Sequence, residues 1–199
     1  MSRPFILGLT GSIGMGKSAV AAMLRDLDVP VFDADAVVHQ LQGPEGPLLP
    51  AIEQAFPGTT GPDGVRRAEL GAQVFGNVEA LQRLEAIVHP AVAAQREAFL
   101  RENENKPLIV FDIPLLYEKG HGSSLDAVAV VSAPAEAQRQ RVLARPGMTQ
   151  EKFEHILKLQ VPDAEKRARA DFVIDTGLPL AATREQVSAL VAKLREKGA

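Results

Sequence analysis

A lysine and a serine follow four closely spaced glycines in the stretch GLTGSIGMGKSAV, residues 8–20. Gly11 to Ser18 fit the pattern G-x-x-x-x-G-K-S/T. Glycines let the backbone curl so that several N–H groups form a nest for anionic oxygens, and a helix that follows adds the positive end of its dipole. In this pattern the lysine reaches the β- and γ-phosphates of a nucleotide, and the serine hydroxyl is a ligand for Mg²⁺. The stretch therefore predicts a polyphosphate site.

This motif alone does not name a reaction, because GTPases, ATPase motors and small-molecule kinases all use it. GTPases read guanine with an N-K-x-D element. The one Asn-Lys pair of the sequence, Asn105-Lys106, continues with Pro-Leu, so that element is absent. A chain of 199 residues is also short for a motor module with its extra strands. A small kinase is the favoured interpretation.

Carboxylates follow the second predicted strand in VFDADAVVHQL, residues 31–41. In open α/β sheets, ligands bind outside the carboxyl ends of the strands, so Asp33 is expected to face the γ-phosphate. There it can accept a proton from an attacking hydroxyl or hold Mg²⁺ through water. Asp35 has a second explanation, since aspartate is a common cap of the helix that follows.

Three further charged positions have both a functional and a structural explanation. Asp112 ends the apolar run IVF and is expected near the metal, or else it is a turn or capping residue before Pro114. Arg141 and Arg145 are four residues apart and share one helix face, where guanidinium groups suit the charge of a transferring phosphoryl group. The alternative for the arginines is a solvated helix face. His89-Pro90 is expected to break a helix.

Five short apolar runs rich in Val, Ile and Phe are typical of buried parallel strands, because both faces of such strands are covered. Amphipathic helical patterns lie between them. Strand–helix alternation predicts an α/β fold, a doubly wound parallel five-stranded sheet in the three-layer arrangement of P-loop NTPases. The five predicted strands are Phe5 to Thr10, Val29 to Asp33, Leu108 to Pro114, Ala127 to Ser132 and Asp171 to Asp175.

The connection of about 70 residues between the second and third strands is too long for a simple crossover. It contains three helical patterns, interrupted by the loop PGTTGPDG, and predicts an all-helical substrate lobe inserted at about 36–105 rather than an independent domain. A polar helix follows Pro146-Gly147 and is expected to be a lid at about 146–160. The core is then 1–35, 106–145 and 161–199. The expected helices of lobe and lid are Leu48 to Phe56, Ala68 to Phe75, Val78 to Leu100 and Thr149 to Gln160.

The composition excludes several classes of protein. Hydrophobic residues make up 46% and charged residues 24%, with a net charge of −3, so no overall basic footprint for nucleic acid exists. The absence of cysteine excludes disulfides, thiolate catalysis and cysteine-based zinc sites. No apolar run reaches the roughly 18 residues that span a bilayer, and the N-terminal run is too short for a signal peptide. A cytoplasmic protein without a membrane partner is expected, as a monomer or weak homo-oligomer.

Taken together, the motifs resemble those of the dephospho-CoA kinases over nearly the whole chain. The order and spacing of the motifs carry the resemblance more than any one of them. They are GLTGSIGMGKS, DAD with His39 four residues later, Arg67 with Leu70 and Val74-Phe75, LEAIVHPAV, DIPLLYE, Arg141 with Arg145, and ADFVID. One departure concerns the adenine end: many members carry Asn-x-Gly there, and this chain has Asp175-Thr176-Gly177.

The resemblance implies transfer of the γ-phosphate of ATP to the ribose 3′-hydroxyl of dephospho-coenzyme A, with Mg²⁺, as the last step of coenzyme A synthesis. It implies catalytic roles for Lys17, Arg141 and, as general base, Asp33, with Ser18 and Asp33 near the metal. Residues implied to bind ATP are Gly11, Ser12, Ile13, Gly14, Met15, Gly16, Lys17, Ser18, Ala19, Arg141 and Arg145. Residues implied to bind the acceptor are Thr10, Asp33, Arg67, Leu84, Ile87, His89 and Asp112.

Two alternatives remain open at this point. One is a P-loop kinase for another small acceptor, such as a nucleoside monophosphate, although the inserted lobe is larger than such an acceptor needs. The other is a nucleotide-dependent switch without an acceptor, against which the missing N-K-x-D element and the position of Asp33 both count.

Overall fold

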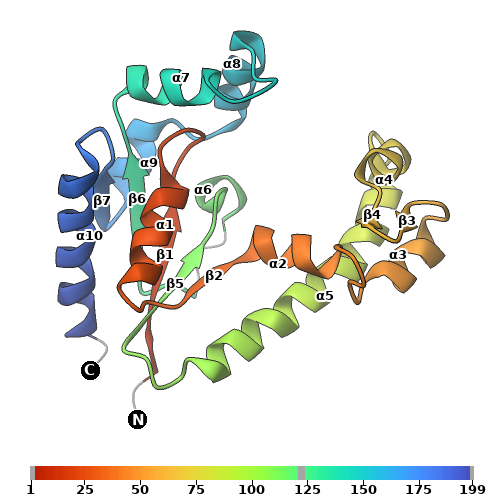
Figure 1. The fold of residues 1–199 in the computed structure, drawn as a ribbon, viewed down its shortest axis with the longest axis horizontal. Helices are drawn as coiled ribbons and strands as arrows, with labels where there is room; N and C mark the ends of the chain where they lie inside the picture. The colour runs from red at the N-terminus through yellow and green to blue at the C-terminus, as the bar shows by residue number, and fades with distance from the viewer. Residues whose placement is uncertain (1–2, 121–123, 198–199) are drawn as a thin grey trace. The chain divides into compact units, whose positions relative to one another are not determined.

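The computed structural model describes residues 3–120 and 124–197. The chain divides into two compact units, and each is considered by itself (Figure 1). The first unit comprises Met1–Phe32 and Asn103–Ala199, and the second comprises Asp33–Glu102.

The first unit contains a five-stranded sheet in the order β2-β5-β1-β6-β7. The central strand β1 pairs in parallel with β5 and β6, and β6 pairs in parallel with β7. The predicted α/β fold with its parallel sheet is confirmed. Strand β2 begins after Pro30 and β5 ends before Pro114, because proline has no N–H to donate to the ladder. The strands are β1 Phe5–Thr10, β2 Val31–Asp33, β5 Leu108–Asp112, β6 Ala127–Ser132 and β7 Phe172–Asp175.

Both faces of this sheet are covered, which explains why its strands are continuously apolar. On one face, Leu7 and Leu9 of β1 share a core cluster with Leu24 of α1 and with Val187 and Leu194 of α10. The alternate residues Ile109 and Val130 are also fully buried. The helices of this unit are α1 Lys17–Asp26, α6 Leu116–Lys119, α7 Ala135–Leu143, α8 Gln150–Leu159, α9 Asp163–Arg169 and α10 Leu180–Arg195.

The second unit has a core of its own, built around Ile52, Phe56 and Leu70. Its helices are α2 Ala34–Leu41, α3 Leu49–Ala55, α4 Arg67–Val74 and α5 Val78–Glu102. The sequence predicted an all-helical lobe, and this prediction is wrong. The loop PGTTGPDG forms a small antiparallel hairpin of β3 (Thr60–Gly61) and β4 (Gly64–Val65). Gly64 has φ +98°, a value that glycine adopts without strain, and this turn chemistry favours the hairpin.

Helix α5 runs without interruption through Pro90, so the helix break predicted at His89-Pro90 is wrong. A proline inside a helix removes one backbone hydrogen bond and crowds the carbonyl four residues earlier, at a cost of about 3 kcal/mol. Helix α5 packs against α2, α3 and α4, and its residues between Ala80 and Val92, on both sides of Pro90, join the core of the unit. This packing outweighs the local cost. Within the described ranges, no helix is both long and apolar enough to cross a membrane.

Candidate active site

The glycine-rich loop between β1 and α1 has a backbone that other residues would strain. Gly14 and Gly16 have φ values of +77° and +86°, and Gly16 is the N-cap of α1. A Cβ atom on Gly14 would also lie 2.4 Å from Cγ2 of Val142. Glycine is therefore required at these two positions by conformation, and at Gly14 by space as well.

The loop presents a row of backbone donors. No hydrogen bond within residues 3–120 and 124–197 engages the N–H groups of Gly14, Gly16, Lys17 or Ser18. These groups lie at the N-terminus of α1, where the helix dipole adds positive potential. A nest of free N–H groups at such a terminus is an anion site, and a polyphosphate fits it.

Lys17 forms an ion pair with Asp112 at the carboxyl end of β5. The side chain of Asp112 is 4% exposed and that of Lys17 is 18% exposed. A charged pair this far out of water is little screened by solvent, so the attraction between its two charges is stronger than in a surface pair. Asp112 therefore fixes the lysine ammonium beside the loop, a role that neither sequence explanation of this residue included.

Arg141 of α7 is connected to the loop through Thr176. Its Nη1 donates to Thr176 Oγ1 at 3.1 Å and its Nη2 donates to the Thr176 carbonyl at 2.6 Å. Thr176 Oγ1 donates to the carbonyl of Met15 at 2.6 Å. Arg145 lies just beyond the end of α7 with its side chain exposed. The two arginines therefore differ, since Thr176 orients the side chain of Arg141 whereas the side chain of Arg145 is exposed.

Two hydroxyl groups near the loop are buried. Thr10 is fully buried and donates to the carbonyl of Pro114 at 3.3 Å, so its hydroxyl holds the segment that follows β5. Ser12 is 5% exposed, and its hydroxyl has no partner among the described residues. Ser18, in contrast, is exposed on the first turn of α1.

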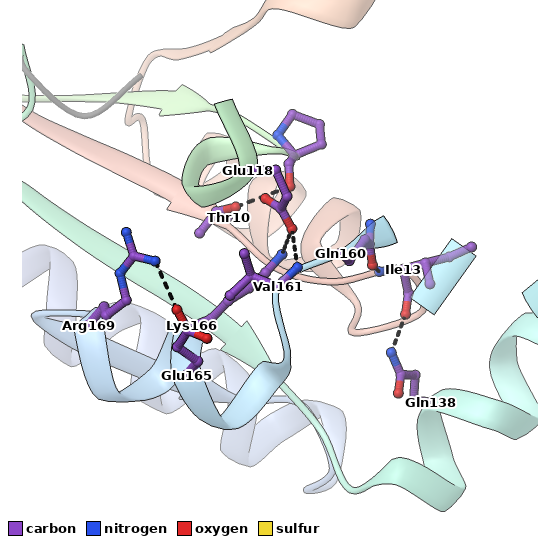
Figure 2. A network of polar contacts seen from close by, with 10 residues as sticks. Thr10, Ile13, Glu118, Gln138, Gln160, Val161, Glu165, Lys166 and Arg169 are labelled. Atoms are coloured by element: carbon purple, nitrogen blue, oxygen red, sulfur yellow. Dashed lines mark hydrogen bonds and ion pairs between the residues drawn. The ribbon is translucent and has the colours of Figure 1, made fainter. Parts of the chain in front are cut away.

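A buried ion pair of Glu118 and Lys166 lies beside the loop that follows α8 (Figure 2). Lys166 is fully buried, and its Nζ is 2.8 Å from Glu118 Oε1. The same oxygen accepts from the N–H of Val161 at 2.9 Å. Burial alone would raise the pKa of Glu118, but the bonds from Lys166 and Val161 and the charge of Lys166 together lower it. The sequence contains no signal for this pair, since Lys166 stands among other charged residues.

In the second unit, Asp33 is the N-cap of α2. Its Oδ1 accepts from the N–H of Ala36 at 2.9 Å. The capping role that the sequence offered for Asp35 therefore belongs to Asp33. Asp35 is exposed in the first turn of the helix and lines a pocket within this unit.

This pocket has a volume of about 570 Å³ and mixed polar and apolar walls. It brings together Arg67 and Leu84, which the resemblance implied to bind the acceptor. Ile87 packs against the core of the unit and His89 is exposed on α5, and neither lines the pocket. The lining residues are Asp35, Val38, His39, Gln42, Val65, Arg67, Leu70, Gly71, Val74 and Leu84.

His39 is a lining residue to which the sequence assigned no role. Its signal was available, because His39 is four residues after Asp35 and such residues share a helix face.

The chain is similar to known proteins over almost its whole length. The family model for dephospho-CoA kinase matches residues 5–179. The dephospho-CoA kinase of Novosphingobium aromaticivorans is 77% identical over 197 residues, which cover 99% of this chain and 98% of that protein. A crystal structure of a Thermus thermophilus protein is 36% identical with a TM-score of 0.81, covering 96% of this chain and 98% of the other. The dephospho-CoA kinase of Campylobacter jejuni, at 24% identity and a TM-score of 0.65 over 95% and 96% of the two chains, shares the fold. With a nucleotide loop of this geometry and matches over almost its whole length, the chain belongs to the dephospho-CoA kinase family.

Proposed function

We propose that this chain transfers the γ-phosphoryl group of ATP to the ribose 3′-hydroxyl of dephospho-coenzyme A and releases coenzyme A and ADP. This reaction is the final step of coenzyme A biosynthesis. The observation that carries the proposal is the anion nest at the start of α1 with the Lys17–Asp112 pair beside it, in a chain of this family. We further propose a cytoplasmic enzyme that acts as a monomer or weak homo-oligomer.

ATP binds with its phosphates in the loop from Gly11 to Ala19. The free N–H groups of the loop hold phosphate oxygens, and the ammonium of Lys17 neutralises the β- and γ-phosphates. Arg141 and Arg145 add forked donors toward the transferring group. Phosphoryl transfer needs little covalent help, so positioning and charge neutralisation supply most of the rate enhancement.

The residues of the loop fit a magnesium ion that arrives with the nucleotide. Mg²⁺ prefers oxygen ligands and is usually held by one or two protein groups together with substrate phosphates. The exposed hydroxyl of Ser18 suits such a position, with Asp33 acting through water. The described residues contain no cluster of three or more His, Cys, Asp or Glu that would hold a metal without phosphates. When bound, the ion neutralises charge that develops on the phosphates.

Asp33 is the general base for the 3′-hydroxyl. One oxygen of its carboxylate is engaged as a helix cap by Ala36. The other oxygen makes no hydrogen bond or ion pair with the described residues and is available to accept a proton. A cap bond fixes the orientation of the carboxylate, and a fixed base within reach of the hydroxyl contributes about 10²–10⁴-fold to the rate.

The pocket of the second unit binds part of the acceptor. Its Arg67 guanidinium suits a phosphate of dephospho-coenzyme A, and its apolar walls include Val38 and Leu84. The residues that we assign to the acceptor are Thr10, Asp33, Arg67, Leu84, Ile87, His89 and Asp112. Among them, Thr10 acts through the segment at Pro114 to which it is bonded, and Asp112 acts through the side chain of Lys17 with which it is paired.

The deciding experiment measures ADP release with Mg-ATP in the presence of dephospho-coenzyme A, AMP, adenosine or no acceptor. Turnover that requires dephospho-coenzyme A is expected. Turnover with AMP, or equal ADP release without an acceptor, would leave a nucleotide site but reject this acceptor.

A further inference from the structure

Two glutamine side chains form hydrogen bonds with the backbone of Ile13 in the nucleotide loop, one with its N–H and the other with its carbonyl. The N–H of Ile13 donates to Gln160 Oε1 at 3.1 Å. The carbonyl of Ile13 accepts from Gln138 Nε2 at 2.8 Å. Figure 2 shows both side chains directed at Ile13. Gln138 belongs to α7 and Gln160 directly follows α8, so the two residues bracket the segment that contains α8.

These bonds fix two successive peptide planes. In a trans peptide the C=O and the next N–H point in opposite directions. Holding the carbonyl of Ile13 toward Gln138 therefore turns the N–H of Gly14 away from Gln138, and that N–H is one of the free donors of the nest. Holding the N–H of Ile13 toward Gln160 turns the carbonyl of Ser12 the other way, where it accepts from the N–H of Met15 at 3.1 Å.

Both glutamines are themselves held in place. Gln138 is 6% exposed, and the same helix presses Val142 against Gly14. Gln160 precedes Val161, whose N–H is bonded to Glu118 of the buried pair with Lys166. The amide groups therefore meet Ile13 from two anchored segments and not from mobile surface chains.

We propose that Gln138 and Gln160 are positioning residues for ATP. Their bonds to Ile13 hold the loop with its free N–H groups available to phosphate, and they do so only while the segment containing α8 is packed against the loop. The proposal rests on the proposed function, because it concerns the same nucleotide site. A loop that lacks either bond must order this peptide when ATP binds. The expected weakening of ATP binding is about 5- to 10-fold for each glutamine.

The test uses Gln138→Met and Gln160→Met in the full chain, since methionine keeps the length of the side chain and removes its hydrogen bonds. We expect the Kd and KM for ATP to rise about 5- to 10-fold. The kcat at saturating ATP and the KM for dephospho-coenzyme A should stay within about twofold. Because both bonds act on one residue, the double variant should weaken ATP binding by less than the product of the single effects.

Matched controls are Gln140→Met on α7 and Gln150→Met on α8. Both residues are exposed, and their amides bond only to side chains on α7 and α8. Neither control should change the Kd for ATP. If Gln160→Met does not fold, Gln160→Asn decides, since its shorter amide cannot reach Ile13.

Three results would overturn the inference. They are an unchanged Kd for ATP in the glutamine variants, an equal rise in the controls, and a parallel loss in kcat and both KM values, which would indicate a merely structural role. A wild-type chain that binds ATP but turns over without dephospho-coenzyme A would instead reject the proposed function and leave the ATP-binding comparison intact.

Discussion

The guanidinium of Arg141 donates two hydrogen bonds to Thr176, from Nη1 to the hydroxyl oxygen at 3.1 Å and from Nη2 to the backbone carbonyl at 2.6 Å. The same hydroxyl donates to the carbonyl of Met15 in the nucleotide loop. One threonine therefore sets the direction of the arginine relative to the loop. The contacts of Thr176 therefore connect the segment Asp175-Thr176-Gly177 to Arg141 and to the glycine-rich loop.

Arg141→Lys keeps the positive charge but cannot make both bonds to Thr176, because an ammonium has no planar fork. We expect kcat/KM for ATP to fall about 10- to 100-fold, the range for a lost hydrogen bond to a charged group. Steady-state kinetics with varied ATP checks this. Thr176→Val removes the hydroxyl and leaves the carbonyl, so its effect should be smaller, and an Arg141→Lys enzyme with wild-type kinetics would contradict the role of the fork.

Asp33→Asn should lower kcat by about 10²–10⁴-fold with little change in the KM for ATP, because asparagine cannot accept the proton. Asparagine caps a helix as well as aspartate does, so the thermal midpoint should hold. The matched variant Asp33→Ala loses the cap and should cost about 1 kcal/mol of stability in addition. A steep rise in the KM for ATP with kcat preserved would show that Asp33 is not the base.

Lys17→Met should abolish measurable ATP binding and also destabilise the fold, because it removes the ion pair between Lys17 and the buried carboxylate of Asp112. Removing one member of a buried pair costs about 3–5 kcal/mol. The double variant Lys17→Met with Asp112→Asn should regain most of the free energy of unfolding but no ATP binding. Urea denaturation and calorimetric titration separate the two effects, and recovery of ATP binding in the double variant would speak against the role of Lys17.

Glu118 should make stability depend on pH. Its pKa is lower in the folded chain than in the unfolded chain, so its contribution is complete above the unfolded pKa of about 4.3. That contribution is lost as pH falls through the folded pKa, because the unfolded state then binds more protons. As the pH drops below about 5, the free energy of unfolding should therefore fall more steeply in the wild type than in Glu118→Gln.

Urea denaturation at about pH 7, 5, 4 and 3, values that lie on both sides of the unfolded pKa, measures the free energy of unfolding of the wild type and of Glu118→Gln. At neutral pH, Glu118→Gln should be the less stable protein, because Lys166 loses its counter-charge. The control is Glu165→Gln, an exposed carboxylate of α9 that pairs with Arg169 at 3.2 Å. Parallel pH curves for wild type and Glu118→Gln would reject the assignment.

The strands and the nucleotide loop were predictable because their signals are local. A strand buried on both faces is a short apolar run, and all five runs became strands with ends shifted by no more than two residues. The loop is defined by residue types at fixed spacing, and Gly14 and Gly16 adopt the left-handed backbone that explains the glycines.

Other features depend on partners far apart in the sequence and could not be predicted. Lys166 occurs in a polar segment, and only its contact with Glu118 makes it a buried residue. Gln138 and Gln160 lie in polar segments of the sequence, and only the fold brings their side-chain amides to the backbone of Ile13. The helix break predicted at Pro90 was wrong because the prediction used a local preference of proline, and the packing of α5 in its unit overrides that preference.

The central place of β1 in the sheet has a consequence for the order of events during synthesis. Both neighbours of β1, namely β5 and β6, come from the second half of the chain. Both hydrogen-bonding edges of β1 are therefore filled only after Ala127–Ser132 has been synthesised, whereas Asp33–Glu102 is one continuous stretch that can close its contacts earlier. A nascent chain that already carries the complete glycine-rich motif therefore has β1 without both of its paired neighbours until Ser132 has been synthesised, and unpaired strand edges are sites at which chains aggregate.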